Sequence, residues 1–484
     1  MGARPPRRRL AGCGAVSHGS GSERTNFNRY NRRESIGGVK RTSAAFAKTT
    51  GTERARAMTS NDRGTHPLFP AGNALPFFLV TTLFFLWGIP NNLNDVLIRQ
   101  FMKSFEISRF EAGLIQFAFY LGYFLLAIPA GLLMRRLGYK AGFVTGLILY
   151  GVGALLFWPA AIVGRYSFFL VALFVIASGL SFLETGSNPF IAQCGDPETS
   201  ERRLNFSQAF NPFGAITGAL VGTIFIFSGV ELNPHQVAAM QAAHTYNAYL
   251  RLETLRVIRP YAVLGCIALA WAVLIIRTKF PRIAGETDAT HTDHGNVRDL
   301  LRARHFILAV VAQFLYVGAQ VGTWSYFITY VQDYAHEPEK IAGYFLTGTL
   351  VAFGVGRFLS SYLMKFVAPT RLMGVYSLIN VALIAIGVFM PGWIGLWAIF
   401  LTSLFMSLMF PTIFALGLKN LGPNTKIAGS LIVMAIIGGA LFPPAMGLLS
   451  ERLRSLALAY GMLLPAYAFI AYYAFVGSRV RVTE

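Results

Sequence analysis

Two carboxyl groups stand in strongly apolar sequence, where acids are rare. Asp95 follows the stretch "FFLWGIPNNLN", and Glu184 lies within "LSFLETGSNPF". A charged side chain inside a membrane span is energetically costly and usually faces a water-filled cavity or a partner. A carboxyl group that is neutral or charged according to water access is what proton coupling requires. We therefore expect Asp95 and Glu184 to be the proton-coupling residues.

Both acids also have a plainer interpretation. A neutral Glu184 could tie two helices together by hydrogen bonds, and Asp95 could be a helix-end residue that meets headgroup water. Against the second interpretation, Pro90 and the asparagine pair that follows it are expected to break the helix where it lines a cavity. Irregular backbone is tolerated at membrane depth in such places. We therefore favour a functional role for both acids.

Amide and aromatic side chains recur at helical spacing and predict a substrate-binding face. Gln208 and Asn211 are three positions apart, on one face of a helix. Gln313, Gln320 and Trp324 form a similar stripe on a later apolar run. Neutral amides both donate and accept hydrogen bonds, as sugar hydroxyls do, and an aromatic ring can pack against the C–H face of a pyranose. These residues predict a monosaccharide site, with hydrogen bonding between helices as the alternative role.

Two other sets of polar residues are less decisive. Gln116, Tyr120 and Tyr123 form the same kind of stripe, and it is equally consistent with contacts between helices. Arg357 is the basic residue well inside its apolar run. Long basic side chains near helix ends reach the membrane interface. We therefore expect Arg357 to snorkel to the cytoplasmic face rather than to pair with a carboxylate.

The composition excludes a large soluble protein and argues against an enzyme. The chain has 484 residues, of which 54% are hydrophobic and 13% charged, whereas soluble domains are about 25% charged. Its three cysteines have no paired spacing, which excludes a disulfide scaffold and a cysteine-based zinc site. Nucleotide-binding, serine-hydrolase and metalloprotease motifs are missing, and the histidines fall in loops, tails or helix ends. We expect no catalytic residue, no metal and no cofactor.

Long apolar runs predict the elements that must position these residues. The fold class expected is an all-α integral membrane protein with two pseudo-symmetric halves of six helices each. The polar stretch 278–304 is expected to be a cytoplasmic linker between a half at 67–277 and a half at 305–484, and a second polar loop spans about 229–257. The twelve spans are expected at 75–97, 111–134, 141–162, 167–193, 205–228, 258–277, 305–331, 342–365, 372–391, 394–418, 427–449 and 457–478.

Charge sets the expected orientation, and it marks the N-terminus as unusual. Lysine and arginine are more frequent in the loops that are cytoplasmic if the N-terminus is inside. We expect a multi-pass protein of the bacterial inner (plasma) membrane with both termini in the cytoplasm. Residues 1–66 are expected to be a disordered basic tail. For 1–57 the alternatives are an incorrect start with Met58 as the true one, a tail attracted to anionic lipid, and a transit peptide; no nucleic-acid partner is expected.

Motifs spread over ten or more of the expected helices resemble the L-fucose–proton symporter family of the major facilitator superfamily. They include "LFFLWGIPNNLNDVL", "FLETGSNPF", "QAFNPFGAI", "QFLYVGAQVGTWSY" and "VMAIIGGALFPPAMG", and the resemblance covers about 75–478. It implies alternating access and a central sugar site between the halves. It also implies that Asp95 and Glu184 carry coupling and binding, and that Asn92, Gln208 and Asn211 bind substrate.

One motif departs from the wider superfamily, and several functions stay open. The loop after the second span usually reads G-x-L-x-D-R-x-G-R-K, but Arg135 and Tyr139 replace its Asp and its second Arg. The expected partners are a monosaccharide, above all L-fucose, the proton and membrane lipid, and we expect a monomer. The alternatives are a glucose/galactose or N-acetylglucosamine permease of the same family, coupled to protons or sodium, a membrane sugar sensor or scaffold, and a membrane enzyme.

Overall fold

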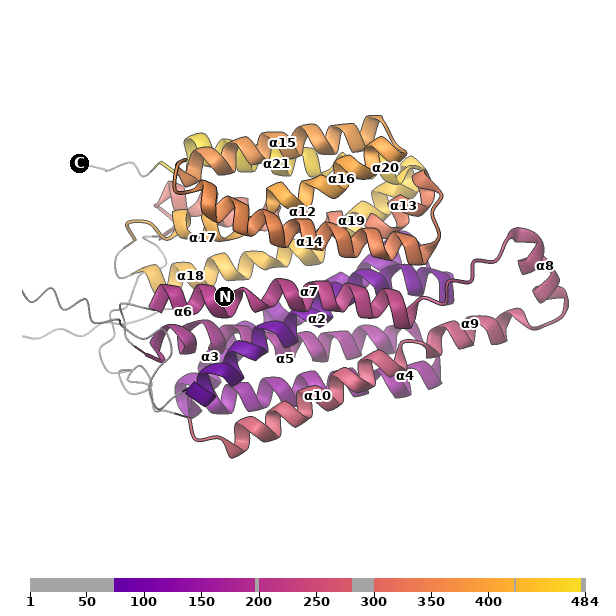
Figure 1. Ribbon diagram of the computed structural model, residues 1–484, viewed down its shortest axis with the longest axis horizontal. Coiled ribbons are helices and arrows are strands. Elements are labelled where there is room, and N and C mark those ends of the chain that lie inside the picture. Colours follow the sequence, from indigo (N-terminus) through magenta and orange to yellow (C-terminus); the bar gives the residue numbers. More distant parts are fainter. Residues whose placement is uncertain (1–73, 196–199, 281–299, 422–423, 480–484) are drawn as a thin grey trace, which may run out of the picture. The chain divides into compact units, whose positions relative to one another are not determined.

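A computed structural model describes residues 74–195, 200–280, 300–421 and 424–479, and the elements in these ranges are all helices (Figure 1). Helices are favoured because a helix satisfies its own backbone hydrogen bonds inside lipid. The expected disordered tail at 1–66 and most of the expected linker at 278–304 lie outside the described residues. Residues 65–484 form one compact unit.

The first six expected spans correspond to the helices from α2 to α10, drawn in indigo to rose in Figure 1. The polar loop at 229–257 contains two further short helices, α8 and α9, which the sequence analysis did not predict. The elements of this half are α2 (Ala74–Ser104), α3 (Arg109–Leu155), α4 (Phe157–Val163), α5 (Tyr166–Gln193), α6 (Ser200–Gln208), α7 (Phe210–Val221), η2 (Gly222–Ile226), α8 (Pro234–Ala242), α9 (Tyr246–Leu255) and α10 (Ile258–Arg277).

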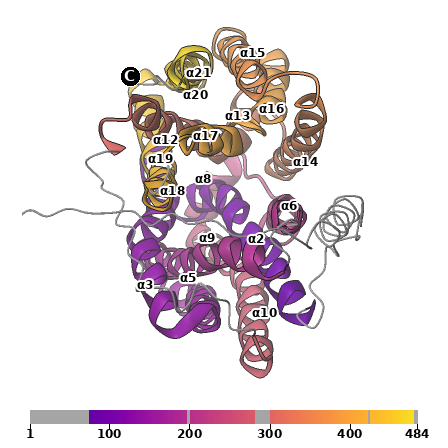
Figure 2. The same ribbon diagram turned by 90° about the vertical axis from the view of Figure 1, so that its left-hand side faces the viewer.

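The other six expected spans correspond to the helices from α12 to η6, in orange to yellow, and Figure 2 shows both sets of helices from one end. Several of these spans consist of two helices in series. The elements are α12 (Arg304–Ser325), α13 (Phe327–Ala335), α14 (Glu339–Leu363), α15 (Pro369–Phe389), α16 (Trp393–Met406), α17 (Met409–Gly417), α18 (Thr425–Met434), η5 (Ala435–Ile437), α19 (Gly438–Leu453), α20 (Leu456–Tyr460), α21 (Leu463–Tyr472) and η6 (Tyr473–Gly477).

The described residues contain 11 helical stretches that are long and apolar enough to cross a membrane, and one of them holds two spans. The stretch Arg109–Val163 is interrupted at Gly138, whose φ of 83° and ψ of 167° are not helical. A Cβ atom at Gly142 would collide with the side chain of Met134, so the chain folds back on itself there. Glycine suits this reversal because it adopts positive φ without steric cost. The twelve expected spans are therefore accounted for.

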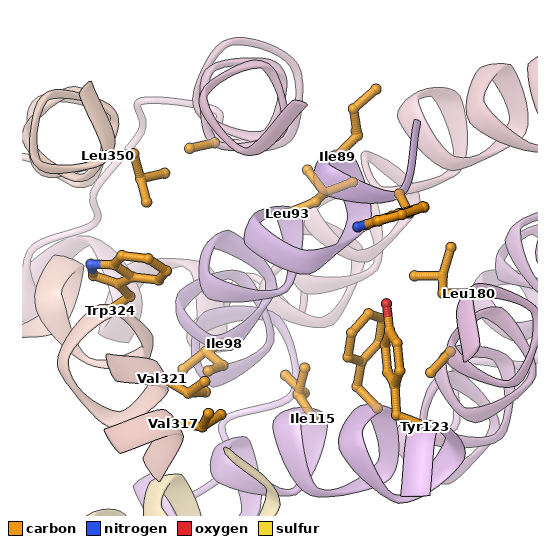
Figure 3. Packing of buried hydrophobic residues seen from close by; sticks show 14 of the residues in the cluster. Ile89, Leu93, Ile98, Ile115, Tyr123, Leu180, Val317, Val321, Trp324 and Leu350 are labelled. Carbon is orange, nitrogen blue, oxygen red and sulfur yellow. The ribbon is translucent and has the colours of Figure 1, made fainter. Parts of the chain in front are cut away.

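The N-terminal and C-terminal sets of helices share one buried apolar cluster. Figure 3 shows part of it, with Ile98 of α2, Ile115 of α3 and Val317 and Val321 of α12. These four side chains are at most 4% exposed. Lipid is as apolar as these side chains, so the hydrophobic effect does not drive helices together in a membrane. Close van der Waals packing of this kind drives their association instead. The two sets of helices are therefore in contact along part of their length.

The helices of the two sets begin and end at the same two ends of the bundle. We call the end where α2 ends and α3 begins (Ser104 and Arg109) the outer end. The end where α5 ends and α12 begins (Gln193 and Arg304) is the inner end. The loop charges predict that the outer end faces the outside of the cell.

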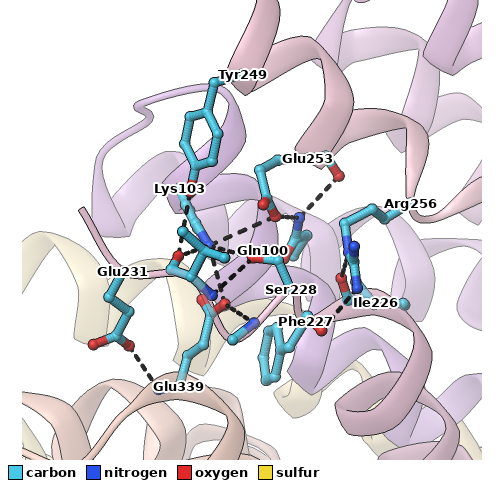
Figure 4. Close-up of polar contacts among 12 residues, drawn as sticks. Gln100, Lys103, Ile226, Phe227, Ser228, Glu231, Tyr249, Glu253, Arg256 and Glu339 are labelled. Atoms are coloured by element: carbon cyan, nitrogen blue, oxygen red, sulfur yellow. Dashed lines mark hydrogen bonds and ion pairs between the residues drawn. The ribbon is translucent and has the colours of Figure 1, made fainter. Parts of the chain in front are cut away.

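A buried polar cluster joins the two sets of helices at the outer end (Figure 4). The Nζ atom of Lys103, on α2, donates to Oε1 of Glu339, on α14, over 3.0 Å. It lies 3.6 Å from Oε2 of Glu253, on α9, and donates to Ser228. The side chain of Gln100 donates to Glu253 as well. One cation therefore holds two carboxylates from different helices.

A second group of contacts closes the same end between α3 and the C-terminal helices. The guanidinium group of Arg109 pairs with the carboxylate of Asp333 and donates to Ser450. Burial raises the pKa of Asp333, and the neighbouring Arg109 opposes that shift. The hydroxyl of Tyr326 lies 2.6 Å from the carbonyl oxygen of Arg109 and 2.9 Å from that of Pro443.

The helices α3 and α19 pack closely at a glycine. A Cβ atom added to Gly113 would lie 2.7 Å from the Cα atom of Pro444, which is a backbone atom and cannot turn away. A glycine at this position permits the contact because it carries no side chain. The outer end is thus closed by close backbone packing as well as by ion pairs.

Candidate functional site

A cavity of about 240 Å³ lies between the N-terminal and C-terminal helices, near the middle of their length. It is lined by side chains from α2, α3, α5, α6 and α7 on one side and from α12, α14 and α17 on the other. Its lining residues are Phe84, Trp87, Asn91, Asn92, Asp95, Gln116, Tyr120, Glu184, Asn188, Gln208, Asn211, Pro212, Ala215, Tyr316, Gln320, Val321, Trp324, Leu350, Phe353, Arg357 and Phe410.

The polar half of α2 brings Asn92 and Asp95 to this cavity without a break in the helix. The expectation that Pro90 and the asparagine pair break the helix is wrong, because α2 runs continuously from Ala74 to Ser104 with Pro90 inside it. Proline is tolerated inside membrane helices when neighbouring groups satisfy the freed carbonyl. The polar side chains therefore line the cavity from a regular helix.

Asp95 accepts hydrogen bonds from three different helices. Its Oδ2 atom accepts from Asn92, one turn earlier on α2, over 3.2 Å. Its Oδ1 atom accepts from the amide of Gln116, on α3, over 2.8 Å and from the hydroxyl of Ser325, at the end of α12, over 3.3 Å. The side chain is 2% exposed. A carboxyl group this deeply buried needs such donors when it is ionised.

Glu184 lies on α5, farther from the outer end than Asp95, and it also lines a second cavity. This second cavity has a volume of about 630 Å³ and extends to the inner end, where Arg135 and Leu418 line it. Tyr120, Glu184 and Asn188 line both cavities. The carboxyl group of Glu184 therefore lies between the central site and the inner end of the bundle.

The expected substrate-binding residues come together at the central cavity, with one exception. Asn92, Gln208, Asn211, Gln320 and Trp324 all line it. The ring of Trp324 is 9% exposed and is fixed by a 3.0 Å hydrogen bond from its Nε1 atom to Ser403. The Nδ2 atom of Asn211 donates to the carbonyl of Phe84 over 3.3 Å, and Gln208 donates to Asn188 over 3.2 Å. Both amides therefore keep their carbonyl oxygens for other partners.

The matching protein family settles what kind of protein this is. The model of the Major Facilitator Superfamily matches residues 76–426, which is well over half of the chain. The chain belongs to the Major Facilitator Superfamily. The superfamily consists of transporters, and the multi-pass, all-helical fold with two sets of six helices is the one that the sequence analysis expected from the resemblance.

Individual members of the superfamily are similar over most of the chain. The L-fucose-proton symporter of Escherichia coli (strain K12) is 44% identical over 412 residues, which are 84% of this chain and 93% of that protein. A glucose/galactose transporter of Brucella abortus biovar 1 (strain 9-941) is 34% identical over 406 residues, which are 83% of this chain and 93% of that protein. Both relatives belong to the branch that the sequence motifs of this chain resemble.

A solved structure extends the comparison to three dimensions. A crystal structure of FucP, described as a superfamily transporter in the outward conformation, aligns with a TM-score of 0.64 and 43% identity. The alignment covers 84% of this chain and 99% of that chain. In the present structure the outer end is closed by contacts of Lys103, Arg109 and Gly113, and the larger cavity extends to the inner end.

Gln313 is the expected substrate-binding residue that does not reach the central cavity. Its side chain is fully buried, it is not among the lining residues, and neither of its amide atoms has a partner among the described residues. It shares a helix face with Gln320, but it lies two turns nearer the inner end of α12, about 10 Å away along the axis. The sequence spacing predicted the helix face of Gln313 correctly, but not its position along the axis of α12 relative to the cavity.

Arg357 lines the central cavity, so the expectation that it snorkels to the membrane interface is wrong. It lies well inside α14, and its guanidinium carbon is 5.5 Å from the centre of the Phe353 ring. Leu350, Phe353 and Arg357 all line the cavity at helical spacing, which is a signal that the sequence did contain. Asn188, one turn after Glu184, could have been found in the same way.

The arrangement can bind a small polyhydroxyl compound and a proton. The N-terminal wall carries both carboxyl groups and most of the amides, and the C-terminal wall carries Trp324, Phe353 and Arg357. Amide groups match hydroxyl groups because each both donates and accepts. Since the two walls belong to different sets of helices, a ligand in the cavity contacts both sets at once.

Proposed function

We propose that this protein is a proton-coupled symporter of L-fucose that works by alternating access. The observation that carries the proposal is the central cavity, in which two carboxyl groups, Asp95 and Glu184, stand among amides and aromatic rings. The proposal is supported by 44% identity to an L-fucose-proton symporter over most of both chains.

The proposed sugar-binding residues come from both walls of the cavity. Asn92, Gln208 and Asn211 hydrogen-bond sugar hydroxyls from one wall, and Gln320 does so from the other. Trp324 packs its ring against the C–H face of the sugar. The ring is held by Ser403, so it presents a fixed surface and loses little rotamer freedom on binding.

The proposed cycle couples the sugar to the proton through Asp95 and Glu184. In the outward-facing form the sugar and a proton enter from outside, and the outer end then closes through the contacts of Lys103 and Arg109. In the inward-facing form the sugar leaves through the larger cavity, and Glu184 meets water from the inner end. A charged carboxylate in a low-dielectric interior is costly, so the sugar-loaded form crosses only with its proton bound. The empty form returns after that proton has left toward the inner end, and each turnover therefore moves a proton inward with the sugar.

Location and assembly follow as parts of the same proposal. The protein is a multi-pass membrane protein, and we place it in the bacterial inner membrane with both termini in the cytoplasm, as the loop charges predict. Its halves are residues 67–277 and 305–484. It acts as a monomer among membrane lipids, because each chain carries a complete cavity between its two halves.

A second candidate keeps the mechanism and changes the sugar. The 34% identity to a glucose/galactose transporter favours glucose or galactose as the next substrates to test. N-acetylglucosamine and sodium coupling belong to the same alternative. The fold and the cavity are common to all of these candidates.

Sugar-induced proton uptake tests the proposal directly. Vesicles or cells expressing the full chain, and in parallel the chain from Met58, receive L-fucose, D-arabinose, galactose, glucose and N-acetylglucosamine in turn. Alkalinisation of the medium on addition of L-fucose, but not of glucose, is the expected result. Alkalinisation with glucose or galactose alone would identify that sugar, and not L-fucose, as the substrate. If the chain binds one of these sugars but no sugar changes the pH of the medium, the proposal of proton coupling is wrong.

A further inference from the structure

Asp95 and Ser325 connect the two sets of helices at the level of the central cavity. Asp95 lies on α2, and Ser325 is the last residue of α12, in the other half. The hydroxyl of Ser325 lies 3.3 Å from Oδ1 of Asp95 and 3.1 Å from Nε2 of Gln116, which itself donates to Asp95. All three side chains are at most 2% exposed. The contact therefore exists only while the halves are packed together here.

The hydrogen bonds favour one charge state of Asp95. An ionised carboxylate accepts hydrogen bonds and donates none. The amide of Gln116 and the hydroxyl of Ser325 both approach it as donors. Donors aimed at a buried carboxylate stabilise its ionised form. Asp95 therefore releases a proton more readily with Ser325 in contact than without it.

Gln116 also contains an acceptor suited to the other charge state. Its Oε1 atom is buried and has no hydrogen-bond partner among the described residues. A neutral carboxylic acid carries one O–H donor, and a rotation of the amide would present Oε1 to that donor. The same side chain can thus satisfy Asp95 in both protonation states.

We infer that Ser325, with Gln116, is a positioning residue that makes proton release from Asp95 depend on closure of the outer end. This inference rests on the proposed symport. When the outer end opens, the end of α12 separates from α2 and Asp95 loses the donor of Ser325, so it keeps its proton. When the outer end closes, the donor returns and the proton leaves toward the inner end. By linkage, ionised Asp95 stabilises the closed outer end to the same extent.

Other ionisable groups surround Asp95, and the test leaves them unchanged. The titratable and charged groups that face this part of α2 in the described structure are Tyr120 on α3, Glu184 on α5, Tyr316 on α12, Arg357 on α14 and Tyr460 on α20, with Arg99 and Lys103 on α2 itself and Glu253 on α9 nearer the outer end.

The test varies the pH inside vesicles and removes the hydroxyl of Ser325. L-fucose uptake is measured at fixed outer pH over a series of inner pH values, with wild type, Ser325→Ala and Ser325→Thr. We expect Ser325→Ala to need an inner pH higher by about half a unit to one unit for half-maximal uptake, the effect of one hydrogen bond. Counterflow of L-fucose needs no net proton release and should stay near wild type. Ser325→Thr keeps the hydroxyl and should restore the wild-type profile.

A matched control separates this effect from the loss of any buried hydroxyl. Ser360, on α14, is fully buried and its hydroxyl has no partner among the described residues. Ser360→Ala should leave the pH profile unchanged. An unchanged profile in Ser325→Ala, an equal shift in Ser360→Ala, or a failure of threonine to restore the profile would each overturn the inference.

Two further measurements keep the outcome interpretable. If Ser325→Ala does not reach the membrane, Gln116→Met takes its place and should shift the profile in the same direction, and no shift would overturn the inference. The wild-type chain is measured first. A wild type without L-fucose counterflow defeats the proposed function, whereas a normal wild type with an unshifted Ser325→Ala defeats only the role of Ser325.

Discussion

Lys103 and Glu339 meet across the two halves with 3.0 Å between Nζ and Oε1, and the side chain of Glu339 is fully buried. Glu253 lies 3.6 Å from the same ammonium group. Opening the outer end would separate Lys103 from Glu339. The pair is therefore a contact of one conformation of the transporter rather than of the fold as a whole.

Removing the cation of this pair should impair closure of the outer end. In Lys103→Met two carboxylates stay buried without a cation, and breaking a buried pair on one side costs about 3–5 kcal/mol. We expect net sugar uptake to fall more than tenfold, while sugar binding measured by calorimetry persists. In Lys103→Met with Glu339→Gln the buried charge is reduced, so uptake should partly recover. If the double variant is no better than the single one, the pair does not act as described.

Gly113 should be intolerant of even one added carbon. In Gly113→Ala the Cβ atom would lie 2.7 Å from Cα of Pro444, so the outer end cannot close fully. We expect a protein that is inserted and binds sugar but transports it at less than a tenth of the wild-type rate. Gly131→Ala, on the same helix, is the control, because a Cβ atom there meets nothing within 4 Å. Equal transport by both variants would contradict the closure seen at Gly113.

Glu184→Gln should separate sugar movement from proton movement. The amide keeps the size and polarity of the side chain but cannot change charge. We therefore expect L-fucose counterflow to continue while accumulation against a gradient and sugar-induced alkalinisation are lost. The two assays are run on the same vesicles. If full proton-coupled uptake survived the substitution, Glu184 would not be in the coupling path.

Arg357 should contribute to sugar affinity from the C-terminal wall. Its side chain lines the central cavity, and its buried Nε atom has no hydrogen-bond partner among the described residues. Hydrogen bonds from a charged group contribute about 1.5–3 kcal/mol, so Arg357→Met should raise the KM for sugar about tenfold or more. Arg357→Lys keeps the charge but not the fork of donors, and its KM should lie between the two. An unchanged KM in Arg357→Met would exclude a contact with the sugar.

The order and number of the membrane helices could be predicted because apolar length is a local signal. The runs of about twenty apolar residues each became helices at the expected places. The reversal at Gly138 was also visible, as a charged stretch with glycine. The short helix α8 was missed, although Asn233, Pro234 and Gln236 form a helix start that could have been recognised, with a capping box and proline in the first turn.

Sequence patterns could predict which residues of each helix belong to the site, but not the contacts between helices. Asp95 and Glu184 stand out because an acid in an apolar run needs a reason. The contact of Asp95 with Ser325 joins residues 230 positions apart, and no periodicity reports such a pair. The depth of Gln313 and the direction of Arg357 depend on how α12 and α14 are placed against α2, which the sequence pattern does not contain.

Glu184 lines both cavities, and this position bears on how the membrane keeps its proton gradient. In this form water from the inner end can reach Glu184, whereas Asp95 is 2% exposed beneath a closed outer end. In this conformation the two acids are therefore not wetted from opposite sides of the bundle. A transporter that has released its sugar from this conformation offers protons no continuous water path across the bilayer, so this step of the cycle does not dissipate the gradient on which uptake depends.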